Sequence, residues 1–117
     1  MRNYRIILCP DFNTDYGHLE ESEKARVYEF ARQLSNSAIV TGKPLGYLFF
    51  RKKKFNGKRL YFLIYEEWKM IVFVRISGKK DQTVTTVEVK QKLMAYKEFV
   101  REKLNDPNSF VWKFSFF

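Results

Sequence analysis

Six cationic side chains stand close together in residues 51–59, on either side of an Asn-Gly dipeptide. Arginine presents a planar fork of N–H donors that fits a phosphate group. A lysine amine can accept a proton only when its pKa falls, and crowded cations cause such a fall because each disfavours the charge on its neighbour. The residues suited to bind a phosphodiester and to move protons during 2′-hydroxyl attack are therefore Lys52, Lys53, Lys54 and Arg59.

The Asn56-Gly57 dipeptide predicts the element that positions these cations. Both residues tolerate the positive φ of a type I′ turn, which joins two antiparallel strands. The flanking apolar, β-branched and aromatic runs predict strands over about 47–55 and 58–65, and a third over about 70–77. With a two-residue turn, the expected cross-strand pairs are Phe55 with Lys58, Lys54 with Arg59, and Lys52 with Tyr61.

Side chains alternate across a sheet, so one face is expected to carry Lys52, Lys54, Arg59 and Tyr61. Lys54 and Arg59 are expected at the surface. Like charges directly opposite each other destabilise a sheet, so folding alone would not favour this arrangement. One interpretation is a solvated basic face that keeps a sheet edge from pairing with other chains. The other is an anion site, with a phosphodiester backbone as the expected ligand.

The net charge of +9 is concentrated in the same part of the chain. Residues 43–80 contain 11 Lys or Arg and 2 acidic residues, whereas the remaining residues contain 11 of each sign. A local excess of this kind is typical of a protein with a polyanionic partner. Membrane surfaces also attract basic residues, but those residues usually lie on an amphipathic helix or a tail. We therefore expect RNA as a partner, and no membrane.

Residue counts argue against several other kinds of site. With one cysteine and one histidine, the chain offers no zinc ligand set, no Ser-His-Asp triad and no internal disulfide. It also has no glycine-rich phosphate loop, so we expect neither a metal nor a cofactor. The first residues lack a secretory pattern, and no apolar run approaches the roughly 18 residues of a membrane span. The expected compartment is the cytoplasm.

Local patterns predict the remaining elements of one domain over residues 1–117. A short strand over 4–9 is followed by a loop over 11–17 and an amphipathic helix over about 18–35. Thr85 and Glu88 form a capping box that predicts the start of a second helix, which ends near residue 103.

The chain ends in an aromatic tail over residues 105–117. We expect this tail to dock on a sheet edge or a helix, or to cover a partner surface. The predicted fold class is α+β, with a small, mostly antiparallel meander sheet, an N-terminal helix and a C-terminal helix.

Three segments between Gly42 and Leu93 carry a recognisable pattern. The first is Gly42-Lys-Pro-Leu45. In the second, from Phe50 to Phe62, an arginine just past the hairpin turn precedes an apolar-Tyr-apolar strand. The third, from Ile71 to Gln82, is a strand that ends in two basic residues. The pattern resembles the RelE/ParE toxin superfamily, and specifically the RelE-like mRNA interferases.

The resemblance implies the toxin of a type II toxin–antitoxin system, a ribosome-dependent endonuclease that cleaves mRNA by 2′-hydroxyl attack and is neutralised by an acidic antitoxin. By position, Lys52 and Lys54 look like the family's catalytic lysine pair, and Arg59 looks like its phosphate-binding arginine. Lys80 falls where a second catalytic arginine often stands. The expected RNA contacts are Arg51, Lys53, Lys58, Tyr61 and Lys79.

Two departures from the family pattern keep other functions open. Some members carry a tyrosine where this chain has Thr85, Thr86 and Val87, and others use a C-terminal histidine that this chain lacks. Tyr61 or Tyr65 are candidates for the stacking role. The alternative function is a non-catalytic RNA- or ribosome-binding protein on the same fold. The gyrase-inhibiting branch of the superfamily is a third possibility, for which we expect less basic density on this sheet face.

Overall fold

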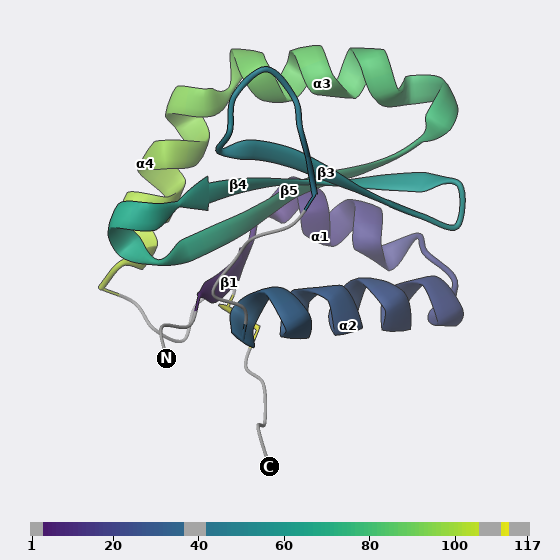
Figure 1. The fold of residues 1–117 in the computed structure, drawn as a ribbon, viewed down its shortest axis with the longest axis horizontal. Helices are drawn as coiled ribbons and strands as arrows, with labels where there is room; N and C mark the ends of the chain where they lie inside the picture. The colour runs from purple at the N-terminus through teal and green to yellow at the C-terminus, as the bar shows by residue number, and fades with distance from the viewer. Residues whose placement is uncertain (1–3, 37–41, 106–110, 113–117) are drawn as a thin grey trace.

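The computed structural model describes residues 4–36, 42–105 and 111–112 (Figure 1). These residues form a six-stranded sheet with the order β2-β3-β4-β5-β1-β6. The strands are β1 (Arg5–Leu8), β2 (Lys43–Pro44), β3 (Phe50–Phe55), β4 (Lys58–Tyr65), β5 (Met70–Gly78) and β6 (Val111–Trp112). β1 is parallel to β5, and all other neighbours in the sheet are antiparallel. The predicted α+β class and the β3-β4-β5 meander are confirmed, and β1 makes the sheet mixed.

Helices cover both faces of this sheet. The helices of the described residues are α1 (Pro10–Gly17), α2 (Glu21–Asn36), α3 (Gln82–Gln91) and α4 (Leu93–Lys103), with short 3-10 turns η1 (Glu66–Trp68) and η2 (Lys79–Asp81). α1 and α2 lie against one face, and α3 and α4 lie against the other (Figure 1). The sheet is therefore the middle of three layers, and each face of the β3-β4 hairpin meets different helices.

The β3-β4 hairpin forms as the Asn-Gly dipeptide predicts. Asn56 and Gly57 have φ values of 47° and 75°, which are the positive values that a type I′ turn requires. The register also matches the expectation, with the three predicted cross-strand pairs in place. The turn chemistry alone was sufficient to fix which side chains share a face.

The predicted loop over 11–17 is wrong, because all of these residues belong to α1. Pro10 stands at the start of the helix, where its fixed φ is already helical and its missing N–H is not needed. Phe12 anchors the helix: its ring is fully buried and meets the Phe73 ring edge-on, with 5.4 Å between the centroids. The helix predicted over about 18–35 is present as α2, and α1 precedes it as an additional N-terminal helix.

The C-terminal helix begins at Gln82, so the predicted capping box at Thr85 is wrong. Thr85 is buried within α3, and Glu88 pairs with Arg75 instead of with the helix start. At Lys92 the backbone (φ −108°, ψ 13°) interrupts the helical path and separates α3 from α4. The two helices still present one apolar side to the core after this break, since Val89, Tyr96 and Val100 are all buried.

A bulge in the β4-β5 ladder decides which β5 side chains face the basic residues. Tyr61 is opposite Arg75, whereas the next residue, Phe62, is opposite Phe73. β5 therefore holds one extra residue at this point. Beyond the bulge, Arg75 and Ser77 lie on the same face of the sheet as Tyr61 and Arg59, as the cross-strand pairs show.

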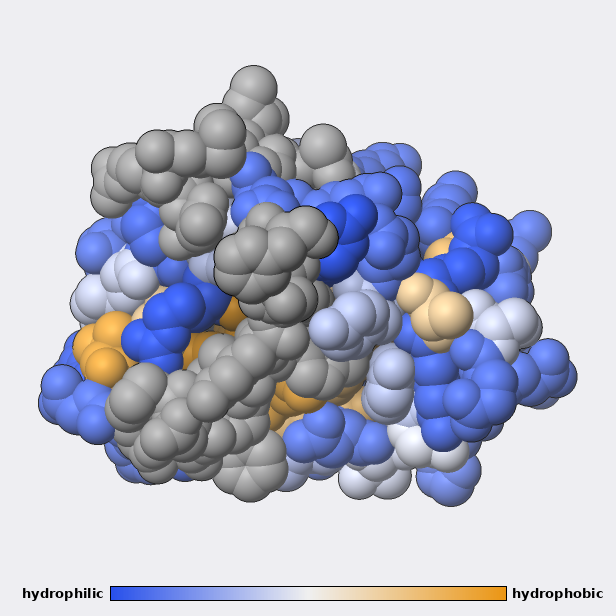
Figure 2. All heavy atoms as spheres, turned by 90° about the horizontal axis from the view of Figure 1, so that it is seen from below, coloured by the Kyte–Doolittle hydropathy of each residue, from blue (hydrophilic) through white to orange (hydrophobic). Residues whose placement is uncertain are grey.

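The face that α1 and α2 cover is sealed by aromatic packing. The Phe62 ring lies 5.8 Å from that of Phe30 and 6.0 Å from that of Phe73, measured between centroids. The outward side of α2 is polar, and hydrophilic residues dominate the visible described surface in the view from below (Figure 2). This face is therefore a packed core under an amphipathic helix.

Two residues of the aromatic tail lie in the sheet. β6 pairs with the free edge of β1, with Ile6 opposite Trp112 and Ile7 opposite Val111. Docking of the tail on a sheet edge is thus confirmed for this short strand, and residues 106–110 and 113–117 lie outside the described part of the chain. Among the described residues, no helix combines the length and the apolar character needed to cross a membrane.

Candidate nucleic-acid interface

Two cations from neighbouring strands converge on one oxygen atom at the start of α3. Lys52 on β3 donates its Nζ hydrogen to Gln82 Oε1 at 2.5 Å, and Arg59 on β4 donates its Nε hydrogen to the same oxygen at 2.9 Å. Arg59 Nη1 also donates to the Gly57 carbonyl oxygen at 3.0 Å, which holds the guanidinium against the hairpin turn. The site is thus preorganised to bind an oxygen atom with two positively charged donors.

Both of these cations are largely withdrawn from solvent. Lys52 and Arg59 are each 6% exposed. The expectation that Arg59 lies at the surface is therefore wrong, because the Gly57 and Gln82 acceptors hold it against the hairpin turn and the start of α3. Lys54 is exposed, as predicted.

Burial has a direct consequence for the protonation of Lys52. Burial is the main cause of the lowered pKa of the Lys52 amine, because the charged form loses hydration. Three neighbouring cations lower the pKa further: Lys54, Lys43 and Arg59. The environment of Lys52 thus disfavours the charged form of its amine.

A hollow of about 320 Å³ lies at the edge of β3 next to this pair. Its lining contains no acidic residue among the described part of the chain and consists of Gly42, Lys43, Lys52, Lys53 and Lys54. Lys54 forms no hydrogen bond or ion pair within the described residues, so its ammonium group is available to a ligand. The hollow is a local concentration of positive charge beside the buried pair.

Gly42 is needed where the chain passes the hollow. Its φ is +108°, and a Cβ atom there would lie 3.0 Å from the Phe62 ring and 3.1 Å from the Lys52 carbonyl oxygen. Only glycine adopts this backbone conformation without strain. The close approach lets β2 pair with β3, with Lys43 directly opposite Lys52.

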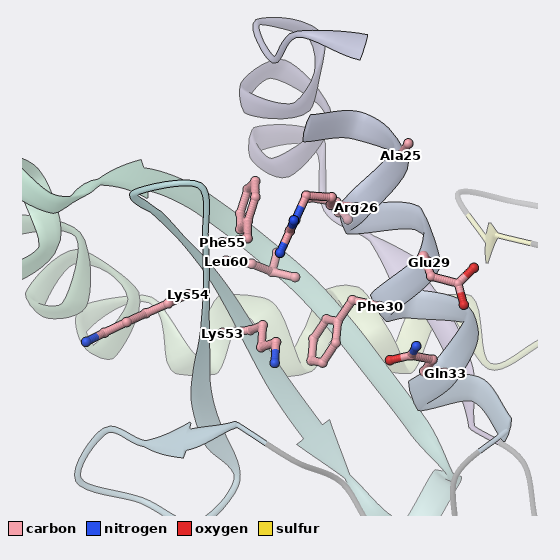
Figure 3. Close-up of a pocket in the computed structure, with 10 residues that line it drawn as sticks. Ala25, Arg26, Glu29, Phe30, Gln33, Lys53, Lys54, Phe55 and Leu60 are labelled. Atoms are coloured by element: carbon pink, nitrogen blue, oxygen red, sulfur yellow. The ribbon is translucent and has the colours of Figure 1, made fainter. Parts of the chain in front are cut away.

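The remaining predicted RNA contacts do not all share this face. Lys53 leaves β3 on the α2 side, where its Nζ lies 5.3 Å from the centre of the Phe30 ring, and Lys54 points away from α2 (Figure 3). Lys58 also faces α2, since its Nζ lies 2.6 Å from Glu23 Oε2. Arg51 donates its Nε hydrogen to the Leu48 carbonyl oxygen at 2.8 Å. The hairpin thus divides the basic cluster between the two faces.

Tyr61 lies beneath the buried pair, not at the surface. It is fully buried, and its hydroxyl is 2.8 Å from Ser77 Oγ. Burial raises the pKa of Tyr61, so its hydroxyl stays protonated at neutral pH. In this conformation the ring forms the floor of the site and presents no face to a nucleotide base.

Lys79 and Lys80 lie in η2, the turn that leads directly into Gln82. Both are exposed, and neither forms an ion pair within the described residues. They stand within three residues of the side chain that joins Lys52 to Arg59. Their positive charge therefore borders the site.

Two polar residues next to the site carry no role in the sequence-based prediction. Gln82 enters the sequence pattern only as the last residue of the third segment, with no role of its own. Arg75 binds Asp15 of α1 through its Nε at 2.7 Å and Glu88 of α3 through its Nη1 at 2.8 Å. It thereby joins both helical layers to β5. No local sequence signal marks Arg75, because its partners lie far away in the chain.

No model of a known protein family matches this sequence, and no curated protein matches it either. Solved structures do match. A chain of the RelBE2 toxin–antitoxin complex from Mycobacterium tuberculosis is 25% identical, with a TM-score of 0.57 over 66% of this chain and 99% of that chain. A free mutant form of Escherichia coli toxin RelE is 15% identical, with a TM-score of 0.62 over 78% of this chain and 98% of that chain.

This domain has the RelE-like toxin fold. The RelB–RelE antitoxin–toxin complex from Methanococcus jannaschii shows the same likeness, with 16% identity and a TM-score of 0.55 over 66% of this chain and 94% of that chain. The resemblance that the sequence predicted is thus confirmed at the level of the fold.

The residues that the sequence pattern places at the tyrosine of some family members lie in α3. Thr85 is buried, Val87 is exposed, and the Thr86 hydroxyl donates to the Gln82 carbonyl oxygen at 2.8 Å. These three side chains offer no aromatic face next to the site. Among the described residues, no group of three or more His, Cys, Asp or Glu side chains is placed to hold a metal ion.

Proposed function

We propose that this protein is the toxin of a type II toxin–antitoxin system and that it cleaves mRNA on the ribosome. The observation that supports this function best is the convergence of buried Lys52 and Arg59 on one oxygen acceptor beside an open basic hollow. The solved structures that share the fold include toxins bound to antitoxins. We propose that the whole chain acts as a single toxin domain in the cytoplasm, where translating ribosomes are found.

The proposed reaction is an attack of the RNA 2′-hydroxyl on the adjacent phosphate. The bond between the 2′-oxygen and phosphorus forms, and the bond from phosphorus to the 5′-oxygen breaks. The products carry a 2′,3′-cyclic phosphate and a 5′-hydroxyl. Because no metal or cofactor takes part in this scheme, side chains must bind the phosphate and transfer both protons.

Each cation of the site has a role in this scheme. Arg59 binds the non-bridging phosphate oxygens, because its fixed guanidinium can stabilise charge that builds up on them. Lys52, with its lowered pKa, accepts the proton of the 2′-hydroxyl. Lys54 donates a proton to the departing 5′-oxygen from the solvent side. Lys80 and Lys79 hold the flanking phosphates from η2.

An antitoxin partner follows from the same charge distribution. A toxin must be kept inactive until it is needed, and the simplest way is for a partner to cover the basic hollow. We propose an acidic antitoxin, because residues 43–80 hold the whole charge excess of the chain. The complexes of similar toxins with RelB support a partner of this kind.

One observation favours the non-catalytic alternative. Thr85, Thr86 and Val87 stand where the sequence pattern places the tyrosine of some family members, and α3 contains neither an aromatic residue nor a histidine. A protein on this fold with weakened proton transfer could still bind RNA or the ribosome through the basic hollow. The gyrase-inhibiting branch is supported by no observation on the site.

The experiment that separates these functions is a translation system reconstituted from purified components. Wild-type protein is added to ribosomes that hold a defined message, and the RNA ends are mapped and tested for a 2′,3′-cyclic phosphate. Lys97→Ala serves as the matched control, since Lys97 is an exposed lysine on α4. Ribosome binding without any cleavage would reject the endonuclease and support the binding protein.

A further inference from the structure

Gln82 occupies the place that a phosphate oxygen would take when RNA first binds, while Lys52 is still protonated. Its Oε1 is the acceptor for both Lys52 and Arg59, so it makes the two contacts that a non-bridging oxygen would make before Lys52 loses a proton and acts as the base. A carboxamide oxygen is neutral, whereas a phosphate oxygen carries negative charge. The two cations would therefore bind the phosphate more strongly than they bind Gln82.

The surroundings of Gln82 allow its side chain to leave this position. Gln82 is the first residue of α3, and its side chain is only partly buried. Its backbone carbonyl accepts the Thr86 hydroxyl at 2.8 Å, so the helix start is held without the side-chain amide. Arg59 is also held independently by the Gly57 carbonyl oxygen. The amide can thus rotate out while the helix and the arginine remain in place.

We infer that Gln82 is an internal ligand that fills the phosphate position in the free protein and is displaced when RNA binds. This inference rests on the proposed function, because it assigns a role to a side chain of the same site. While Gln82 is in place, the buried cations have an acceptor and are not left unpaired in a desolvated site. When RNA enters, the two hydrogen bonds are exchanged for stronger ones to a phosphate. Gln82 is a positioning residue and sets the affinity of the site for anions.

The displacement makes a prediction that a purely supportive role does not. If Gln82 must leave before RNA binds, its removal should strengthen RNA binding, because the cations then have no competing acceptor. If Gln82 only held the cations in position, its removal should weaken binding. Gln82→Ala therefore gives opposite results under the two roles. We expect at least about tenfold tighter binding, because the two charge-assisted hydrogen bonds to Gln82 no longer have to be exchanged.

Gln82→Glu should act in the opposite direction. A carboxylate at this position would bind both cations as a permanent anion and compete with phosphate. We expect RNA binding to be at least about tenfold weaker. We also expect the slope of log affinity against log salt concentration to fall by the amount that corresponds to about one phosphate contact. The same change should raise the pKa of the Lys52 amine, which can be followed by NMR of its side-chain carbon. Both substitutions suit the first turn of a helix, so the fold should be retained.

The probe is a short single-stranded RNA with 2′-O-methyl groups, which binds but cannot be cleaved, and fluorescence anisotropy is recorded at several salt concentrations. Thr83→Glu is the matched control, because it adds the same charge at the next residue, which is exposed and contacts neither cation within the described residues.

Failure of wild-type protein to bind RNA would count against the proposed function. Wild-type binding that Gln82→Ala leaves unchanged or weakens would overturn the Gln82 inference alone. Equal effects of Gln82→Glu and Thr83→Glu would also overturn it.

Discussion

Replacing Lys52 by methionine should make the protein more stable at neutral pH, although it removes a hydrogen-bonded side chain. Methionine keeps an unbranched apolar stem in the space that the lysine stem fills. The substitution removes a charge that is only 6% exposed and that faces three other cations. Gln82 Oε1 loses one donor but keeps Arg59, so no buried acceptor is left unpaired.

We expect the free energy of unfolding to rise by about 1 kcal/mol at pH 7, from relief of like-charge repulsion and of the burial of a charge. For a protein of 117 residues this corresponds to an increase in melting temperature of about 4 °C. The gain should depend on pH in a defined direction. The pKa of Lys52 is lower in the folded protein than its ordinary value of 10.5, so the charged amine destabilises the folded state at neutral pH. This penalty disappears as the pH rises through the folded-state pKa towards 10.5.

The assay is urea unfolding of wild type and variant at a series of pH values, with the difference in unfolding free energy plotted against pH. Lys53→Met is the matched control, because Lys53 is exposed on the same strand and its amine lies over the Phe30 ring. The control should give no gain and little pH dependence. A Lys52→Met variant that is less stable than wild type at pH 7, or whose difference from wild type does not shrink on alkaline titration, would refute the reasoning.

Three further predictions concern residues that stabilise the fold and the basic surface of the site. Arg75→Ala should lower the unfolding free energy by about 3 kcal/mol in urea titration, because it leaves the partly buried carboxylates of Asp15 and Glu88 without their shared cation. A loss below about 0.5 kcal/mol would show that the two carboxylates are solvated well enough without Arg75. Gly42→Ala should lower the unfolding free energy by about 2 kcal/mol, because of backbone strain and contact with Phe62. Gly57→Asn should leave the unfolding free energy nearly unchanged, because its position is open and asparagine tolerates positive φ. Equal losses of stability in the two variants would contradict the special role of Gly42. Reversing the charges of Lys43 and Lys54 should lower both the RNA affinity and its salt dependence more than reversing the charges of Lys90 and Lys97 does. Equal losses of affinity from the two pairs would indicate diffuse attraction instead of a site.

Local chemistry was enough to predict the hairpin and the side chains that share its face. Asn56-Gly57 imposes a two-residue turn, and that turn fixes the pairing of Lys54 with Arg59. The apolar runs of β4 and β5 are long and rich in β-branched and aromatic residues, so their strands were also found within a few residues. These predictions succeeded because each depends on residues that are neighbours in sequence.

The errors have the opposite origin. α1 was missed because one buried ring, Phe12, anchors eight residues, and its partner Phe73 lies in a distant strand. The start of α3 was misplaced because Glu88 binds Arg75 across the sheet, and a capping box cannot be told from such a pair by spacing alone.

Within the site, burial was the property that the sequence could not supply. Arg59 was expected at the surface because arginine usually lies there, yet Gln82 and Gly57 hold it in place. Burial also distinguishes the two lysines of the predicted catalytic pair, since Lys52 is buried and Lys54 is exposed. The position of Gln82 between two strands depends on how α3 packs on the sheet, and no spacing in the sequence reports that packing.

The most direct test of the proposed chemistry is the single-turnover cleavage rate of a ribosome-bound message, measured as a function of pH for wild type, Lys52→Ala and Lys54→Ala. We predict that the wild-type rate rises with pH as the Lys52 amine loses its proton, and that Lys52→Ala lowers the rate by about a hundred- to ten-thousandfold while ribosome binding remains. Lys54→Ala should lower the rate less and keep the rising pH dependence. A Lys52→Ala variant that cleaves at the wild-type rate with an unchanged pH profile would contradict the assignment of Lys52 as the base.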